Sequence, residues 1–188
     1  MALTYSQVPT EKELDSEAPA FSLRGVDGKV HSLEDYRGSK ALLVIFMCNH
    51  CPYVIAVQDR INQLAREFAP RGLSVVGINS NDTVKYPADS FEAMKERAAE
   101  QSFAFDYLID ETQEVARAYG AVCTPDPFLF VREEGRFVLR YHGRIDDSWK
   151  DPAAVKRREL AEAVEAVLSG AKPSGEQVPT MGCNIKWR

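Results

Sequence analysis

The chain has 188 residues, of which 45% are hydrophobic and 27% charged, and it carries a net charge of −5 at pH 7. This length fits one domain over residues 1–188, with a core at about 18–170 and a C-terminal tail at 171–188. Because no basic block stands out, the composition argues against nucleic acid or an anionic membrane as a partner. The longest strongly apolar run, Ala41–Met47, is too short to span a membrane.

The order of hydrophobic patterns predicts strands that alternate with helices. Residues 1–17 are polar, and we expect them to attach loosely. A hairpin around the sequence GVDG is predicted over 20–24 and 29–32, followed by a short helical turn that Ser32 and Asp35 cap. Further strands are predicted over 41–47, 73–79, 105–109, 127–132 and 136–140, and helices over 52–68, 90–101, 113–119 and 152–168. This order favours an α/β fold, a mixed sheet with helices on both faces and one antiparallel edge.

The N-terminal residues lack the basic segment and apolar stretch of a secretory signal, so we expect a cytoplasmic protein. Cytosolic thiols are kept reduced. The four cysteines therefore indicate catalysis or metal binding rather than a framework of structural disulfides.

The segment FMCNHCPYV places two cysteines where the first central strand ends and its helix begins. The N–H groups at a helix start favour a thiolate. We therefore expect Cys48, near the first turn, to ionise and Cys51, inside it, to be shielded. Their separation of three residues would bring the two sulfur atoms close enough to bridge. Of the two residues between them, Asn49 and His50, the histidine would stabilise the Cys48 thiolate further as a cation or hydrogen-bond donor.

A second segment, TPDPFLF, begins at Thr124 and leads into a predicted strand. A proline that enters a strand can be cis, and a cis X-Pro bond is usually a deliberate feature. Here Thr124 and Pro125 would present backbone polar groups to an extended partner chain. The alternative is that Pro125 and Pro127 only shape a turn.

Together these segments resemble the thioredoxin-fold redoxins, in particular the TlpA-like and AhpC/TSA redoxins. The likeness rests on CNHC after an apolar strand and on YGAVCTPDPFLF about two elements later, and it covers roughly residues 18–168. It implies a thioredoxin-like fold and a thiol–disulfide oxidoreductase or isomerase of cell redox homeostasis. In this reading Cys48 attacks, Cys51 resolves and Pro125 is the cis-proline.

The resemblance also implies protein or small-molecule disulfides as substrates, no bound cofactor, and thioredoxin reductase or the glutathione system as electron donor. It suggests Asp82, after the predicted strand at 73–79, as an acidic general base. The chain departs from thioredoxins in carrying Met47 before the first cysteine, where they have tryptophan, and His50 before the second, where they have proline.

Two other functions compete with this reading. A peroxiredoxin-like peroxide reductase would need a proline and a threonine where the chain has Ala41 and Ile45. A metal-binding or scaffold protein could use Cys48 and Cys51 with Cys123, Cys183 or a histidine as zinc ligands, although no second cysteine pair accompanies them. Cys123 and Cys183 are auxiliary thiols or small buried fillers, and the tail around Cys183 is expected to pack back on the body.

Overall fold

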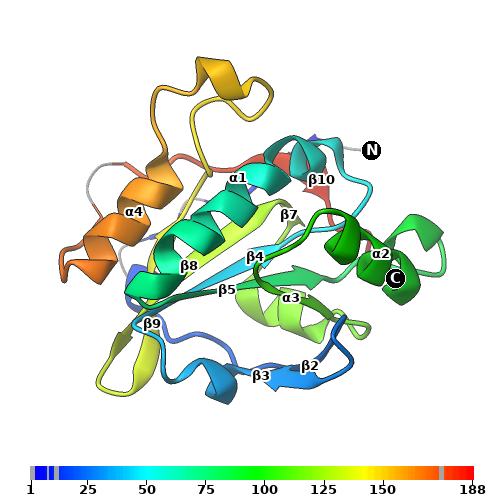
Figure 1. The fold of residues 1–188 in the computed structure, drawn as a ribbon, viewed down its shortest axis with the longest axis horizontal. Coiled ribbons are helices and arrows are strands. Elements are labelled where there is room, and N and C mark those ends of the chain that lie inside the picture. The colour runs from blue at the N-terminus through cyan, green and yellow to red at the C-terminus, as the bar shows by residue number, and fades with distance from the viewer. Residues whose placement is uncertain (1–2, 8, 11–12, 174–175) are drawn as a thin grey trace.

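The computed structural model describes residues 3–7, 9–10, 13–173 and 176–188. Within these residues, a mixed sheet of seven strands forms the centre of the molecule (Figure 1). Its strands, in spatial order, are β3 (Val30–Ser32), β2 (Ser22–Gly25), β6 (Asp106–Ile109), β5 (Leu73–Asn79), β4 (Ala41–Phe46), β8 (Asp126–Glu133) and β9 (Arg136–His142). Strand β4 is parallel to β5 and antiparallel to β8, so the predicted mixed sheet is confirmed.

Strand β4 is buried on both faces because every one of its residues is apolar. Its alternate residues Leu43 and Ile45 face a core formed with α1 (Pro52–Phe68) and α4 (Glu159–Leu168). Leu42 and Val44 face a second core that includes α3 (Glu114–Tyr119). Helices therefore cover both faces of the sheet, as predicted, and α2 (Phe91–Glu100) contacts strand β6 (Figure 1).

The predicted hairpin and helical turn are confirmed. Strands β2 and β3 pair antiparallel, and the 3₁₀ turn Leu33–Tyr36 follows, with Ser32 and Asp35 forming the capping box. Helix α1 begins with Cys51 as its N-cap and Pro52 at its first position, where the missing N–H costs nothing. The N-cap therefore belongs to the second cysteine of the pair.

The prediction of one helix over 152–168 is wrong. The segment forms a short 3₁₀ turn, Pro152–Ala154, and helix α4 starts only at Glu159. The Asp147 carboxylate accepts the backbone N–H groups of Lys156 and Arg157, which a continuous helix would need for its own ladder.

The expectation that residues 1–17 attach loosely is wrong for residues 3–5, which form a paired strand. Residues 1–2, 8 and 11–12 lie outside the described residues. Strand β1 (Leu3–Tyr5) pairs antiparallel with β10 (Met181–Asn184), and β10 pairs on its other side with β7 (Cys123–Thr124). The tail thus packs back on the body, as predicted, and its Ile185 is buried. Within the described part of the chain, none of the helices has the length and apolar character that a membrane span requires.

Candidate active site

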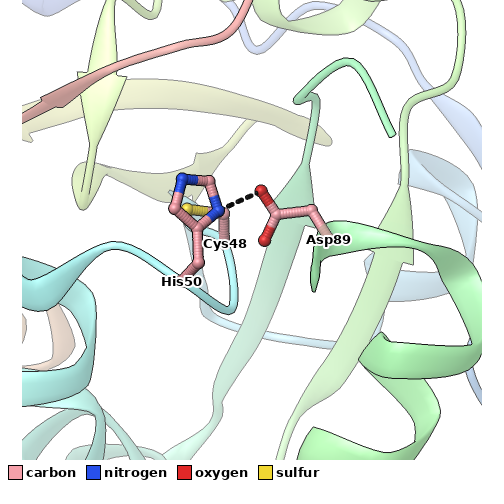
Figure 2. A group of neighbouring side chains, drawn as sticks. All are labelled: Cys48, His50 and Asp89. Carbon is pink, nitrogen blue, oxygen red and sulfur yellow. Dashed lines mark ion pairs between the residues drawn. The ribbon is translucent and has the colours of Figure 1, made fainter. Parts of the chain in front are cut away.

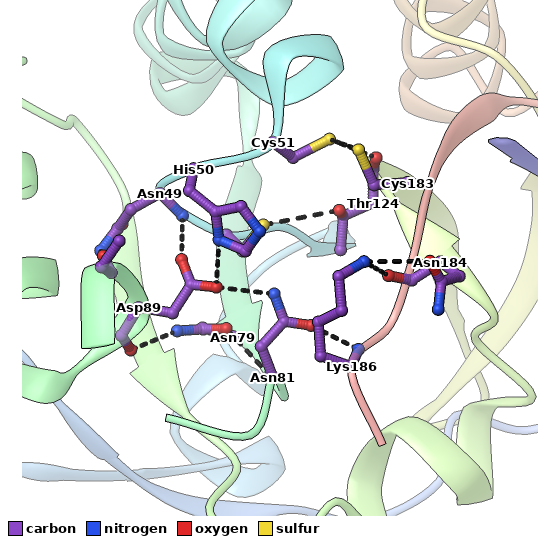
Figure 3. A network of polar contacts seen from close by, with 12 residues as sticks. Asn49, His50, Cys51, Asn79, Asn81, Asp89, Thr124, Cys183, Asn184 and Lys186 are labelled. Carbon is purple, nitrogen blue, oxygen red and sulfur yellow. Dashed lines mark hydrogen bonds and ion pairs between the residues drawn. The ribbon is translucent and has the colours of Figure 1, made fainter. Parts of the chain in front are cut away.

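The sulfur atoms of three cysteines lie around Thr124 at the start of helix α1. Figure 3 shows two of these cysteines, Cys51 and Cys183. The sulfur of Cys51 lies 2.9 Å from that of Cys183 and 3.2 Å from the carbonyl oxygen of Thr124. The sulfur of Cys48 lies 3.6 Å from the hydroxyl oxygen of Thr124. All four cysteines of the chain are thiols in this structure, so the arrangement is that of the reduced protein.

The pKa values of the two thiols of the CxxC pair are shifted in opposite directions. Hydrogen bonds from the Cys48 thiol, then from the Cys183 thiol and the Val54 N–H, lower the pKa of Cys51 to about 5 against the opposing effect of burial. The hydrogen bond to Cys51 and burial raise the pKa of Cys48 well above its ordinary value. The direction of the Cys48 shift is opposite to the expectation that the helix start ionises Cys48, because this thiol donates to Cys51 and is buried. The N-cap of α1 is Cys51 rather than Cys48.

A histidine and a buried carboxylate flank the first cysteine (Figure 2). Nδ1 of His50 lies 2.6 Å from an Asp89 carboxylate oxygen. The Cys48 sulfur, a His50 ring nitrogen and an Asp89 oxygen all lie within 4.8 Å of one another. A nucleophile, a base and a group that orients the base are the parts of an activated nucleophile. The His50 ring also stacks on Tyr86, with 5.6 Å between ring centroids.

Asp89 is fully buried at the centre of a polar network. Its carboxylate accepts the Asn49 N–H at 2.8 Å and the Asn81 side-chain amide at 2.7 Å, in addition to its contact with His50 (Figure 3). Asn79 donates to its backbone carbonyl. Asp89 was not predicted as a site residue. Its one local signal in the sequence is its position directly before Ser90, the N-cap of α2.

Asp82, the predicted general base, makes different contacts. Its carboxylate accepts the Val84 N–H at 3.1 Å and forms ion pairs with Lys85 and Arg188 at 3.5 and 3.7 Å. Its own N–H donates to the carbonyl of Lys186. The carboxylate that the structure brings to Cys48 and His50 is instead that of Asp89.

The Thr124–Pro125 peptide bond is cis, and its loop is held from both sides. On one side the tail approaches so closely that a Cβ on Gly182 would lie 2.1 Å from the Thr124 carbonyl oxygen. On the other side Asp126, fully buried, contacts His142 at 2.7 Å. Cys123 is also fully buried, with its sulfur 3.9 Å from the Pro125 carbonyl oxygen.

The cluster also offers a set of donors for a metal, namely the sulfur of Cys48, a nitrogen of His50 and an oxygen of Asp89. This set differs from the cysteine-rich one considered from the sequence. Each Asp89 oxygen accepts one hydrogen bond, from Asn49 or Asn81, and about two acceptor sites of the carboxylate remain for His50 or a metal ion.

Comparisons with known proteins show the family and the fold of the chain. A model of the AhpC/TSA family matches residues 14–148. The crystal structure of an uncharacterized conserved protein from Geobacillus kaustophilus is 42% identical, with a TM-score of 0.91 over 100% of this chain and 97% of that chain. A crystal structure of a thioredoxin-family thiol:disulfide interchange protein from Chlorobium tepidum is 23% identical, with a TM-score of 0.53 over 63% of this chain and 83% of that chain. The fold is thioredoxin-like.

Two relatives point to thiol chemistry. The thiol-disulfide oxidoreductase ResA from Bacillus cereus is 22% identical over 139 residues, which are 74% of this chain and 75% of ResA. A Mycobacterium tuberculosis protein with a provisional peroxiredoxin name is 30% identical over 105 residues, which are 56% of this chain and 62% of that protein. These likenesses support thiol redox activity of the redoxin kind.

Proposed function

Because the chain belongs to the AhpC/TSA family, we propose that it is a thiol–disulfide oxidoreductase whose reactive dithiol is Cys48 and Cys51. The observation that carries this proposal is the placement of the two cysteines at the start of α1, with Cys51 as its N-cap and Cys48 beside the His50–Asp89 pair. Cys48 keeps 2% of its surface exposed and Cys51 none, which favours Cys48 as the attacking residue.

The proposed reaction begins with the transfer of the Cys48 proton to His50, which Asp89 orients. The Cys48 sulfur bonds to one sulfur of the substrate disulfide and expels the other as a thiolate. The Cys51 thiolate then attacks the Cys48 sulfur and expels the second substrate thiolate. The substrate gains two electrons, and the protein is left with a Cys48–Cys51 disulfide.

We further propose that protein or small-molecule disulfides are the substrates and that Thr124 and Pro125 contact them. An external thiol system, such as glutathione or thioredoxin reductase, would return the dithiol to its reduced state in a cytoplasmic setting. Whether the protein reduces or isomerises disulfides depends on its potential relative to that system.

We expect Cys48→Ser to reduce the rate of insulin-disulfide reduction to that of the reductant alone, because the attacking sulfur is missing. Cys51→Ser should instead accumulate a mixed disulfide between Cys48 and the substrate, since nothing resolves it. Non-reducing gel electrophoresis and mass mapping identify that adduct. An adduct that accumulates on Cys51 in Cys48→Ser, with none on Cys48, would reverse the two roles.

A peroxide reductase is the second candidate, which the peroxiredoxin-named relative favours. Ala41 and Ile45 lie in strand β4 and offer no hydroxyl to a bound peroxide. We therefore expect hydrogen peroxide to oxidise the reduced protein no faster than it oxidises the thiolate form of a small thiol. Stopped-flow measurement of the second-order rate tests this, and a rate several orders of magnitude higher would make the protein a peroxidase.

A further inference from the structure

The tail places a third sulfur in the dithiol site. Cys183 comes from β10, yet its sulfur is 2.9 Å from that of Cys51. A disulfide has an S–S distance of about 2.05 Å, so only a small movement separates this contact from a bond. In Figure 3 the Cys51 and Cys183 side chains point toward each other above Thr124.

The backbone fixes this placement. Cys183 pairs with Thr124 on one side and with Leu3 on the other, so its strand is the middle one of three. Its neighbour Gly182 approaches the Thr124 carbonyl more closely than any side chain would allow. The Thr180 hydroxyl donates to the carbonyl of Pro125 at 3.2 Å. The tail is therefore built against the same loop that the dithiol contacts.

We infer that Cys183 is a third redox-active thiol, which exchanges with the oxidised dithiol to form a Cys51–Cys183 disulfide. The inference deepens the proposed function and rests on it. The Cys183 thiolate attacks the Cys51 sulfur of the Cys48–Cys51 disulfide, a Cys51–Cys183 bond forms, and the Cys48–Cys51 bond breaks. Cys48 leaves as a thiolate and takes up the proton that Cys183 gives up, so no net oxidation occurs and no further reactant is needed.

The charges around Cys183 support exchange in the oxidised state rather than the reduced one. Burial and the hydrogen bond to Cys51 raise the pKa of Cys183 to about 12, whereas the Lys186 ammonium group lowers it. Oxidation of Cys51 removes the thiolate that opposes a second negative charge, and Lys186 stays in place. The step regenerates Cys48 for another substrate and ties the tail to helix α1 by a covalent bond.

Peptide mapping can test this exchange, because Cys48 and Cys51 share the tryptic peptide 41–60 and Cys183 lies in the peptide 159–186. Reduced full-length protein is mixed with an equimolar amount of hydroxyethyl disulfide, quenched with iodoacetamide at successive times, and digested without reduction. We expect a loop within 41–60 first, and then a cross-link between 41–60 and 159–186. Cys51→Ser and Cys183→Ser should lose the cross-link because one of its sulfur atoms is missing, and Cys48→Ser should lose it because Cys183 then has no Cys48–Cys51 disulfide to attack.

Cys123→Ser is the matched control, because Cys123 is equally buried and lies beside β10 but should enter neither disulfide. Circular dichroism confirms that each variant is folded, and Cys183→Ala provides a second variant at the tail. A loop that persists with no cross-link in the wild type overturns this inference and leaves the proposed function standing. If neither product forms although the protein is folded, both proposals fail.

Discussion

Replacing Asp89 with alanine is expected to lower the free energy of unfolding of the reduced protein by about 3–5 kcal/mol. Asp89 is fully buried and takes hydrogen bonds from Asn49 and Asn81 besides its ion pair with His50. Each buried donor that loses its acceptor costs about 1–3 kcal/mol. Urea unfolding under reducing conditions, with equal denaturant slopes, measures the difference.

Asp82→Ala provides the matched control, because Asp82 is also buried and lies in the same long loop. Its ionic partners Lys85 and Arg188 have side chains that are 66% and 52% exposed, so water can replace the carboxylate. We expect a loss of about 1 kcal/mol for this variant. Asp89→Asn, which keeps one acceptor oxygen, should fall between the two. Equal losses for Asp82→Ala and Asp89→Ala would show that the Asp89 network does not hold the site together.

Local sequence patterns located the dithiol and its supporting loop but not all of their neighbours. The apolar strand before Cys48, the helix after Pro52 and the Thr124–Pro125 segment are each visible within a few residues of sequence. Asp89 and Cys183 reach the site from loops and strands far along the chain, and Cys183 is 132 residues from Cys51. Short-range periodicity contains no information about such contacts.

The location of the thiolate depended on one boundary that sequence cannot fix. A shift of one turn in the start of α1 decides whether Cys48 or Cys51 receives the free N–H groups of the helix. The prediction that the polar N-terminal residues attach loosely was wrong for a similar reason. Strand β1 is stabilised by pairing with β10 rather than by burying apolar side chains of its own. In both places the deciding partners are groups that the local pattern does not show, namely the Cys48 and Cys183 thiols for Cys51 and the β10 backbone for β1.

The Cys51 thiolate should be visible as a titration far below that of an ordinary cysteine. Because the pKa of Cys51 is lowered to about 5, the ultraviolet thiolate absorbance of the reduced protein should rise with a midpoint near this pH. Cys51→Ala should remove the step. Cys48 is the strongest donor to this thiolate and Cys183 the next, so Cys48→Ala should raise the midpoint more than Cys183→Ala does. A wild-type midpoint near that of a free cysteine, about 8.5, would contradict the assignment.

The same lowered pKa makes stability depend on pH in a defined direction. The thiolate stabilises the folded state fully above the pKa of an unfolded cysteine, about 8.5. This contribution declines as the pH falls and is lost near the folded value of about 5. As the pH is lowered between these limits, the free energy of unfolding of the reduced wild type should therefore fall more steeply than that of Cys51→Ala. The Cys51→Ala variant is the control, because carboxylates that titrate in the same pH range affect both proteins equally. Parallel curves for the two proteins would mean that the helix start does not hold a thiolate at Cys51.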